Sequence, residues 1–177
     1  MEKKPQRLRL SIPLLGLALF GLNTASDAAE VAKKTGDAEP EYFQAQNEHA
    51  EMHRAVITAR KTVRLFVTAL QHPTPGKTDF QVKKPFIQGA HVEHIWLSDV
   101  QWDGHRFQGR VDNRPHDIQG LKVGQLVSVN PNEISDWMYF DSGNLVGGYT
   151  IRVHYNELSP EQKQEFDRKA DFRIPKQ

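Results

Sequence analysis

Residues 91–111 read HVEHIWLSDVQWDGHRFQGRV, and this stretch decides the fold class. Asp103-Gly104 within it is a dipeptide that favours a tight hairpin turn between two strands. The turn predicts a strand over 98–102 before it and a strand over 105–111 after it. A further strand over 91–97 is expected to precede them. The centre of the chain is therefore antiparallel sheet.

Further strands are expected on both sides of this hairpin. A strand is expected over 80–86, where Pro85 lacks an amide hydrogen and favours an edge or a bulge. Downstream, an apolar strand ends at Pro131, and residues 141–144 form another hairpin turn. That turn is expected to join a strand over 137–140 to one over 145–155. The count is about six short strands in an antiparallel, strongly bent sheet.

Helices are expected at the two ends of the domain. Residues 41–70 carry an apolar stripe at three- and four-residue steps, typical of an amphipathic helix. The stripe consists of Met52, Ala55, Val56, Ala59, Val63, Phe66, Val67 and Leu70. Near the other end, Ser159, Pro160 and Gln162 fit the cap, first residue and capping box of a short helix. The fold class is therefore α+β, with a long N-terminal helix packed on the sheet and a short C-terminal helix.

The first 28 residues have the layout of a secretory signal peptide. A basic start is followed by an uncharged run over 10–26, and small residues precede a cut expected after Ala28. The alternative is a retained membrane anchor, although the run is shorter than the ~20 apolar residues of a spanning helix. Residues 29–40 are expected to be a flexible linker, and 41–177 a single domain. The expected location is periplasmic or secreted, with membrane contact only during export.

Charge and cysteine content exclude several classes of function. The chain has 23 Lys+Arg and 22 Asp+Glu; without residues 1–28 it keeps 19 and 20, a net charge of −1. A nearly neutral domain offers no general basic patch for nucleic acid, so no nucleic acid is expected as partner. The absence of cysteine excludes disulfides, thiol catalysis and cysteine-ligated zinc.

Two histidine clusters raise the question of a metal. His49 and His53 share a helix face, but no glutamate directly follows the first of them, as the metalloprotease pattern requires. On a strand, His91 and Glu93 point to one side and His94 to the other, which is a poor start for a ligand set. We therefore predict neither a metal nor a cofactor.

Four separated clusters resemble the YegJ-like family of bacterial proteins, domain of unknown function 2314. They are Glu93-His94-Ile95-Trp96-Leu97, Asp112-Asn113-Arg114-Pro115, Ile134-Ser135-Asp136-Trp137-Met138 and Gly147-Gly148-Tyr149-Thr150-Ile151-Arg152. The resemblance runs from about residue 52 to residue 155. It implies an uncharacterised bacterial domain and brings no known reaction or ligand with it.

Eight side chains of these clusters are candidates for a binding site. They are Glu93, His94, Trp96, Asn113, Asp136, Trp137, Tyr149 and Arg152. If the bent sheet brings them together, they form a polar pocket walled by the two tryptophans, suited to a small polar ligand or a peptide end. Each residue also has a structural interpretation, such as bonds to loop amides or packing in the core.

The favoured function is a non-enzymatic binding module for a small polar ligand, peptide or protein partner. One alternative is a hydrolase-type enzyme, with Glu93 and Asp136 as acid–base residues and Arg152 as an anion clamp. No nucleophile elbow, phosphate loop or dinucleotide fingerprint accompanies them. The other alternative is a purely structural domain.

Overall fold

The computed structural model describes residues 38–176. The expected signal peptide and most of the expected linker lie outside the described residues. The chain divides into two compact units, Met1–Gln44 and Ala45–Gln177. Of the first unit only residues 38–44 are described, and they are helical. The sheet and the other helices belong to the second unit.

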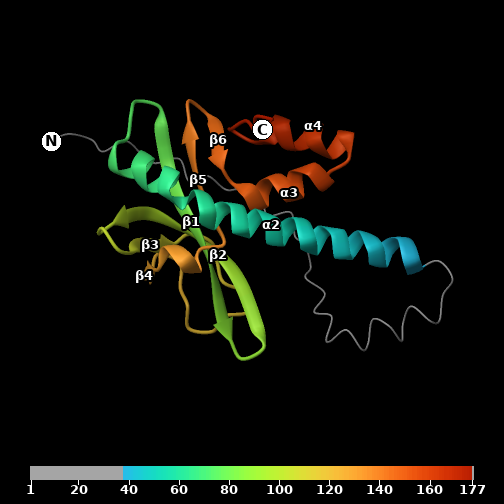
Figure 1. Ribbon diagram of the computed structural model, residues 1–177, viewed down its shortest axis with the longest axis horizontal. Helices are drawn as coiled ribbons and strands as arrows, with labels where there is room; N and C mark the ends of the chain where they lie inside the picture. The colour runs from blue at the N-terminus through green and yellow to red at the C-terminus, as the bar shows by residue number, and fades with distance from the viewer. Residues whose placement is uncertain (1–37, 177) are drawn as a thin grey trace. The chain divides into compact units, whose positions relative to one another are not determined.

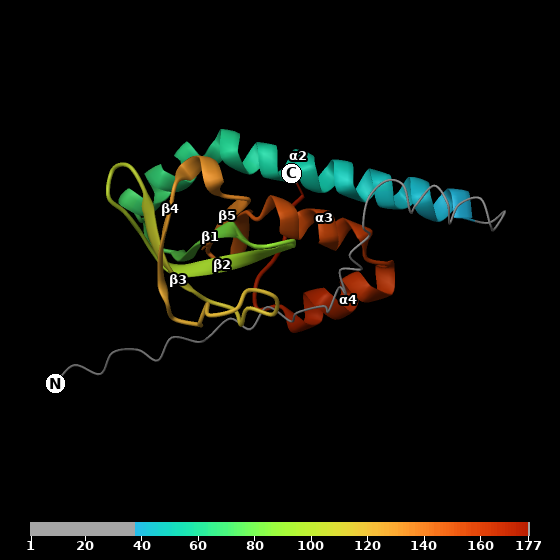
Figure 2. The ribbon, with the colours of Figure 1, turned by 90° about the horizontal axis from the view of Figure 1, so that it is seen from below.

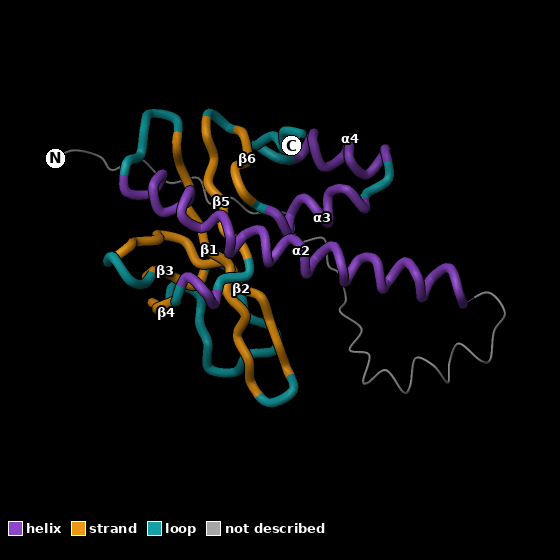
Figure 3. The backbone as a smooth tube through the Cα atoms, in the orientation of Figure 1, coloured by secondary structure: helices purple, strands orange, loops and turns teal. Residues whose placement is uncertain are grey.

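Six strands form one antiparallel sheet (Figures 1 and 3). Their bounds are β1 Lys77–Gln88, β2 His91–Trp102, β3 Phe107–Val111, β4 Leu126–Val129, β5 Asp136–Asp141 and β6 Asn144–Gly147. The order across the sheet is β4-β3-β2-β1-β5-β6, so the sheet is open, with β4 and β6 as its edges. Register shifts interrupt β1 between Thr78 and Gln81 and β2 between Ser98 and Gln101. The predicted α+β fold with about six antiparallel strands is confirmed.

Helix α2 spans Ala38–Gln71, and its second half lies on one face of the sheet (Figure 2). Its stripe reaches the core through Ala59 and Phe66, neither of which has exposed surface. The ring of Phe66 meets those of Phe107 and Trp137 at 5.6 Å between centroids. The long N-terminal helix is thus docked by its apolar face, as the periodicity predicted.

Strand β5 is buried on both faces. On the α2 side Trp137 belongs to the main core. On the other side Phe140 packs against Phe172, with ring centroids 4.9 Å apart, and Phe172 in turn meets Phe166 of α4. Helix α4, Pro160–Lys169, begins at the predicted cap Ser159, whose capping box with Gln162 is complete. The C-terminal helix therefore closes a second, smaller apolar cluster.

The predicted strand over 145–155 is wrong beyond its first residues. Strand β6 ends at Gly147, and helix α3 occupies Tyr149–Glu157. Gly147 and Gly148 both have a left-handed backbone, with φ of 73° and 63°. A Cβ on Gly147 would lie 2.3 Å from the carbonyl oxygen of Trp137, so only glycine fits this corner. The glycine pair turns the chain into a helix instead of bending a strand.

Two other expectations are refined. The strands expected over 91–97 and 98–102 are one strand, β2, with the irregularity at Asp99, whose φ is 51°. Pro85 lies in the centre strand β1, but the pairing of β1 with β5 ends at Lys83. Its missing amide hydrogen therefore faces a local edge, in keeping with the prediction. None of the helices within residues 38–176 is long and apolar enough to cross a membrane.

Candidate functional site

Asp136, the first residue of β5, caps helix α3. It has no exposed surface, and its carboxylate accepts four hydrogen bonds. Three come from the backbone amides of Trp137 (2.8 Å), Tyr149 (3.1 Å) and Thr150 (2.8 Å), and one comes from the hydroxyl of Thr150 (2.7 Å). The N-cap position of α3 is Gly148, which has no side chain, so a distant carboxylate satisfies the free amides of the first turn.

The charge of this carboxylate is balanced from the neighbouring strand. Lys83 of β1 lies directly opposite Asp136 in the register, and its Nζ donates to the Thr150 hydroxyl at 3.3 Å. Burial lowers the pKa of the Lys83 ammonium, and the nearby Asp136 opposes that change. Burial also raises the pKa of Asp136, against the bonds from Thr150 and the charge of Lys83. The Thr150 hydroxyl thus accepts from the cation and donates to the anion.

Trp96 belongs to this cluster and Trp137 does not. Lys83 faces Trp96 across β1 and β2, and its Nζ lies 5.4 Å from the Trp96 ring centroid. Val82, one residue earlier, faces both Leu97 and Trp137, so these side chains occupy the opposite face. There the indole N–H of Trp137 donates to the Ala59 carbonyl of α2 at 2.9 Å. The sheet separates the two tryptophans, and they do not wall a common pocket.

His94 lies at the border of the cluster. Its Nδ1 is 2.9 Å from the hydroxyl oxygen of Ser135, which is buried. Partial burial lowers the pKa of His94, and the charges of Lys83 and Arg60 lower it further. Arg60 is held over this region because its Nε donates to the carbonyl of Ile134 at 2.8 Å. His94 therefore lies in a positive field.

Glu93 and Asn113 brace the loop after β3. Both carboxylate oxygens of Glu93 accept from the amide of His116 at 3.0 Å, and one also accepts from the amide of Asp117. The side chain of Asn113 accepts from the amide of Trp96 at 3.1 Å. These bonds fasten the loop to the edge of β2 beyond the end of β3. Glu93 and Asn113 thus both hold this loop in place, and neither is among the hydrogen-bond partners of Asp136.

Arg152 ties three segments together. Its Nε donates to the Gly147 carbonyl (2.9 Å), one terminal nitrogen to the Leu145 carbonyl (2.8 Å) and the other to the Pro175 carbonyl (2.7 Å). Partial burial lowers its pKa, while Tyr149 and Asp136 favour the charged form. Within residues 38–176 Arg152 forms no ion pair with Glu93 or Asp136, because all three guanidinium nitrogens bond to backbone carbonyls.

Tyr149 links α3 to α2. Its hydroxyl accepts from the hydroxyl of Thr62 at 3.0 Å, and its ring meets that of Trp137 edge-on. Of the eight candidates, the side chains of Trp96 and Asp136 and the backbone amides of Trp137 and Tyr149 join one network, with His94 at its margin. Sequence reasoning missed Lys83 and Thr150, which connect them. Nothing in β1 singles out Lys83, because the strand KTDFQVKKPFIQ carries several other polar residues, including the adjacent Lys84. Ligand binding by the eight residues stays a prediction.

A groove lies elsewhere, between α2 and the end of β2. It has a volume of about 390 Å³ and is lined by Val63, Arg64, Val67, Thr68, Trp102 and Pro131. Its surface is mainly apolar, with Arg64 and Thr68 supplying polar groups from α2. No local pattern of residues indicates this groove, because its walls come from three distant segments.

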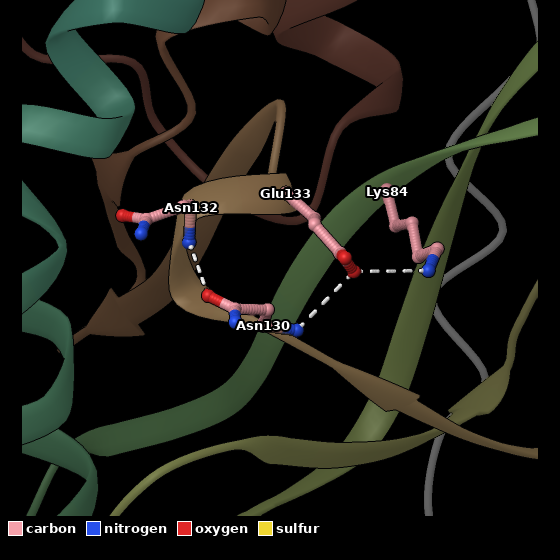
Figure 4. A network of polar contacts seen from close by, with 4 residues as sticks. All are labelled: Lys84, Asn130, Asn132 and Glu133. Atoms are coloured by element: carbon pink, nitrogen blue, oxygen red, sulfur yellow. Dashed lines mark hydrogen bonds and ion pairs between the residues drawn. The ribbon is translucent and has the colours of Figure 1, made fainter.

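One wall of the groove is fixed by a polar network (Figure 4). The short 3-10 helix η1, Pro131–Glu133, begins at Asn130, whose side chain accepts from the Asn132 amide at 3.0 Å. Glu133 reaches back to the Asn130 amide at 3.4 Å and pairs with Lys84 of β1 at 3.2 Å. The hydrogen bond from Lys84 lowers the pKa of Glu133. The network fixes Pro131 against the sheet.

Metal ligands do not gather in the described part of the chain. Within residues 38–176 no group of three His, Asp or Glu side chains is placed to hold an ion. His49 and His53 are exposed on α2.

Comparison with known proteins identifies the family. The family described as an uncharacterized protein conserved in bacteria, DUF2314, matches residues 49–173. The chain therefore belongs to this family. No solved structure matches the chain.

Two curated relatives are similar to part of this chain. A segment of 124 residues, 66% of this chain, is 33% identical to a putative ankyrin repeat protein of Neisseria meningitidis serogroup B and covers 49% of it. A segment of 100 residues, 56% of this chain, is 33% identical to the uncharacterized protein YegJ of Escherichia coli K12 and covers 64% of it. In both cases the chain spans less than two thirds of the relative.

Proposed function

We propose that this chain is an exported, non-enzymatic binding module that holds an apolar segment of a protein partner in the α2 groove. The carrying observation is the groove itself, with the walls Val63, Val67, Trp102 and Pro131. An apolar surface with a tryptophan wall and an arginine at its rim has the composition of a protein-binding site.

The contacts of the candidate acids favour binding over hydrolysis. Asp136 is fully buried and accepts four hydrogen bonds, and both oxygens of Glu93 accept backbone amides. A general base needs a free acceptor within reach of the proton that it removes. Asp136 offers none, because four hydrogen bonds occupy its acceptor sites, and Glu93 is held to the loop after β3 by the amides of His116 and Asp117. The same contacts argue against a small polar ligand as the partner. The side chains of Lys83, Asp136 and Arg152, which would bind it, already form hydrogen bonds inside the domain.

Export is supported by the basic start, the uncharged run over 10–26 and the small residues up to Ala28. If the chain is exported, its partner is located in the periplasm or outside the cell.

A photo-crosslinking amino acid tests the groove. Thr68 suits it as a position, because this rim residue is exposed and its side chain bonds only to its own helix. Gln164, exposed on α4, is the matched control. We expect one partner adduct from position 68 and none from position 164. Trp102→Ala should abolish the adduct, with the unfolding midpoint measured to show that the domain stays folded. Equal adducts at both positions, or an adduct that survives Trp102→Ala in a folded protein, would overturn the proposal.

A further inference from the structure

The half of α2 that borders the groove carries a local excess of positive charge. Residues 52–71 of this helix contain four Lys and Arg side chains and no Asp or Glu, whereas residues 38–51 contain four Glu. The chain as a whole is nearly balanced, so this segment is a clear departure from its average. Such a local field attracts acidic partners and raises the rate at which they associate.

The basic side chains of this segment are not equally available. Arg54 lies 3.8 Å from Glu51 on the same helix, and Arg60 donates its Nε to the carbonyl of Ile134. Arg64 lines the groove, and within residues 38–176 its guanidinium has neither a hydrogen-bond partner nor an ion-pair partner. Its five donors therefore remain free for a ligand.

Arg64 and the apolar residues of the groove are close enough to contact one ligand together. Val63, Arg64, Val67 and Thr68 fall at neighbouring positions on consecutive turns of α2, so they line one side of the groove. Trp102 and Pro131 form the other wall. A ligand that fills the groove with an aliphatic side chain brings its adjacent groups to the guanidinium.

We infer that the partner presents an acidic–aliphatic peptide segment, with an aliphatic side chain against Trp102 and a neighbouring carboxylate paired with Arg64. This inference rests on the proposed function and names the chemistry of its partner. The apolar walls favour a peptide over a nucleic acid, whose phosphates require a surface with several cations along its path. A guanidinium is also the group best matched to a carboxylate, because it can donate two parallel hydrogen bonds.

Three synthetic peptides test the inference with the purified full-length protein. The probe is acetyl-Leu-Asp-Leu-Leu-Asp-Leu-amide, compared with versions that carry Asn or Lys in place of both Asp. Titration calorimetry, with tryptophan fluorescence as a second readout, measures affinity at low and high salt. We expect the Asp peptide to bind about fivefold tighter than the Asn peptide at low salt, the upper range for an exposed ion pair. High salt should remove most of this advantage. The Lys peptide should bind weakest.

Two variants assign the effect to one side chain. Arg64→Gln should bring the Asp and Asn peptides to equal affinity and leave the Asn peptide unchanged. Arg54→Gln, which removes an equal charge from the same helix away from the groove, should keep the Asp advantage. Equal binding of all three peptides would overturn the acidic partner and leave the binding groove in place. Failure of all three to bind would overturn the groove as well. Tighter binding of a labelled single-stranded oligonucleotide than of the Asp peptide would assign the basic segment to nucleic acid and overturn the inference.

Discussion

The carboxylate of Asp136 accepts both the backbone amide and the hydroxyl of Thr150, at 2.8 and 2.7 Å. The two residues belong to different elements, the start of β5 and the first turn of α3. This relationship explains how a short helix can begin directly after two glycines. It also gives a buried carboxylate a structural purpose, with Lys83 as the balancing charge.

Asp136→Asn should destabilise the fold by about 3–5 kcal/mol, the cost of leaving a buried charge without its partner. The amide group would direct N–H donors at backbone donors, and Lys83 would lose its counter-charge. Ser159→Ala provides the matched control, because it removes an exposed local cap of α4 and should cost only about 1 kcal/mol. Urea denaturation measures both. Equal losses in the two variants would show that Asp136 is an ordinary cap without a buried charge network.

His94 should titrate below its ordinary pKa of 6.5, since burial and the charges of Lys83 and Arg60 lower it. Between the folded pKa and 6.5 the unfolded chain binds more protons than the folded one. The stability contributed by neutral His94 is therefore present above pH 6.5 and lost as the pH falls through its folded pKa.

NMR titration of the His94 ring checks this sign. Arg60→Gln should raise the His94 pKa by removing one positive charge, while Arg54→Gln, whose side chain pairs with Glu51 instead, should leave it unchanged. A His94 pKa at or above 6.5 would contradict the positive field described for this corner.

Phe66→Ala should cost about 3–5 kcal/mol, because its ring is fully buried among three aromatic rings and the substitution leaves a cavity. That is a large share of a total stability of roughly 5–15 kcal/mol. Leu65→Ala is the neighbouring control, since Leu65 is 64% exposed and its loss should change little. An unfolding midpoint that Phe66→Ala leaves unchanged would mean that α2 is not docked on the sheet.

Arg152→Met should lower stability by about 2–4 kcal/mol, because three carbonyls of β6, the turn and the C-terminal segment lose charged donors. Arg168→Met on α4 serves as comparison, since that side chain is exposed in a pair with Glu165 and should contribute less than about 1 kcal/mol. A folded Arg152→Met variant of normal stability that no longer binds its partner would return Arg152 to the binding site.

Local signals in the sequence were sufficient for much of the fold. The stripe ending in Phe66 and Leu70 predicted a docked helix, and Ser159 with Gln162 marked the start of α4. Turn residues placed the β2–β3 and β5–β6 hairpins, because a hairpin depends on a few adjacent residues. Each of these features is decided within a short segment of chain.

Features that depend on distant residues were missed or misplaced. Helix α3 is capped by Asp136, which lies thirteen positions before Tyr149. The residues next to Gly148 therefore contain no capping signal that would predict the start of the helix. Trp96 and Trp137 appeared equivalent in the sequence, but the pairing of β1 with both β2 and β5 places them on opposite faces. The groove is likewise formed by α2, β2 and η1. Only the strand register shows which side chains meet.

The first 28 residues should be removed during export. The positive start and the short apolar run predict translocation and a cut after Ala28, which would leave a chain beginning at Ala29 with a net charge of −1. Intact-mass measurement of the protein from an envelope fraction should find that product. Replacing Leu15 and Leu17 with Arg would interrupt the apolar run and should keep the full-length chain in the cytoplasm, whereas Lys33→Gln beyond the cut should not affect processing. A soluble cytoplasmic protein that retains Met1 would contradict export, and a membrane-bound protein of full length would assign the same run to a retained anchor.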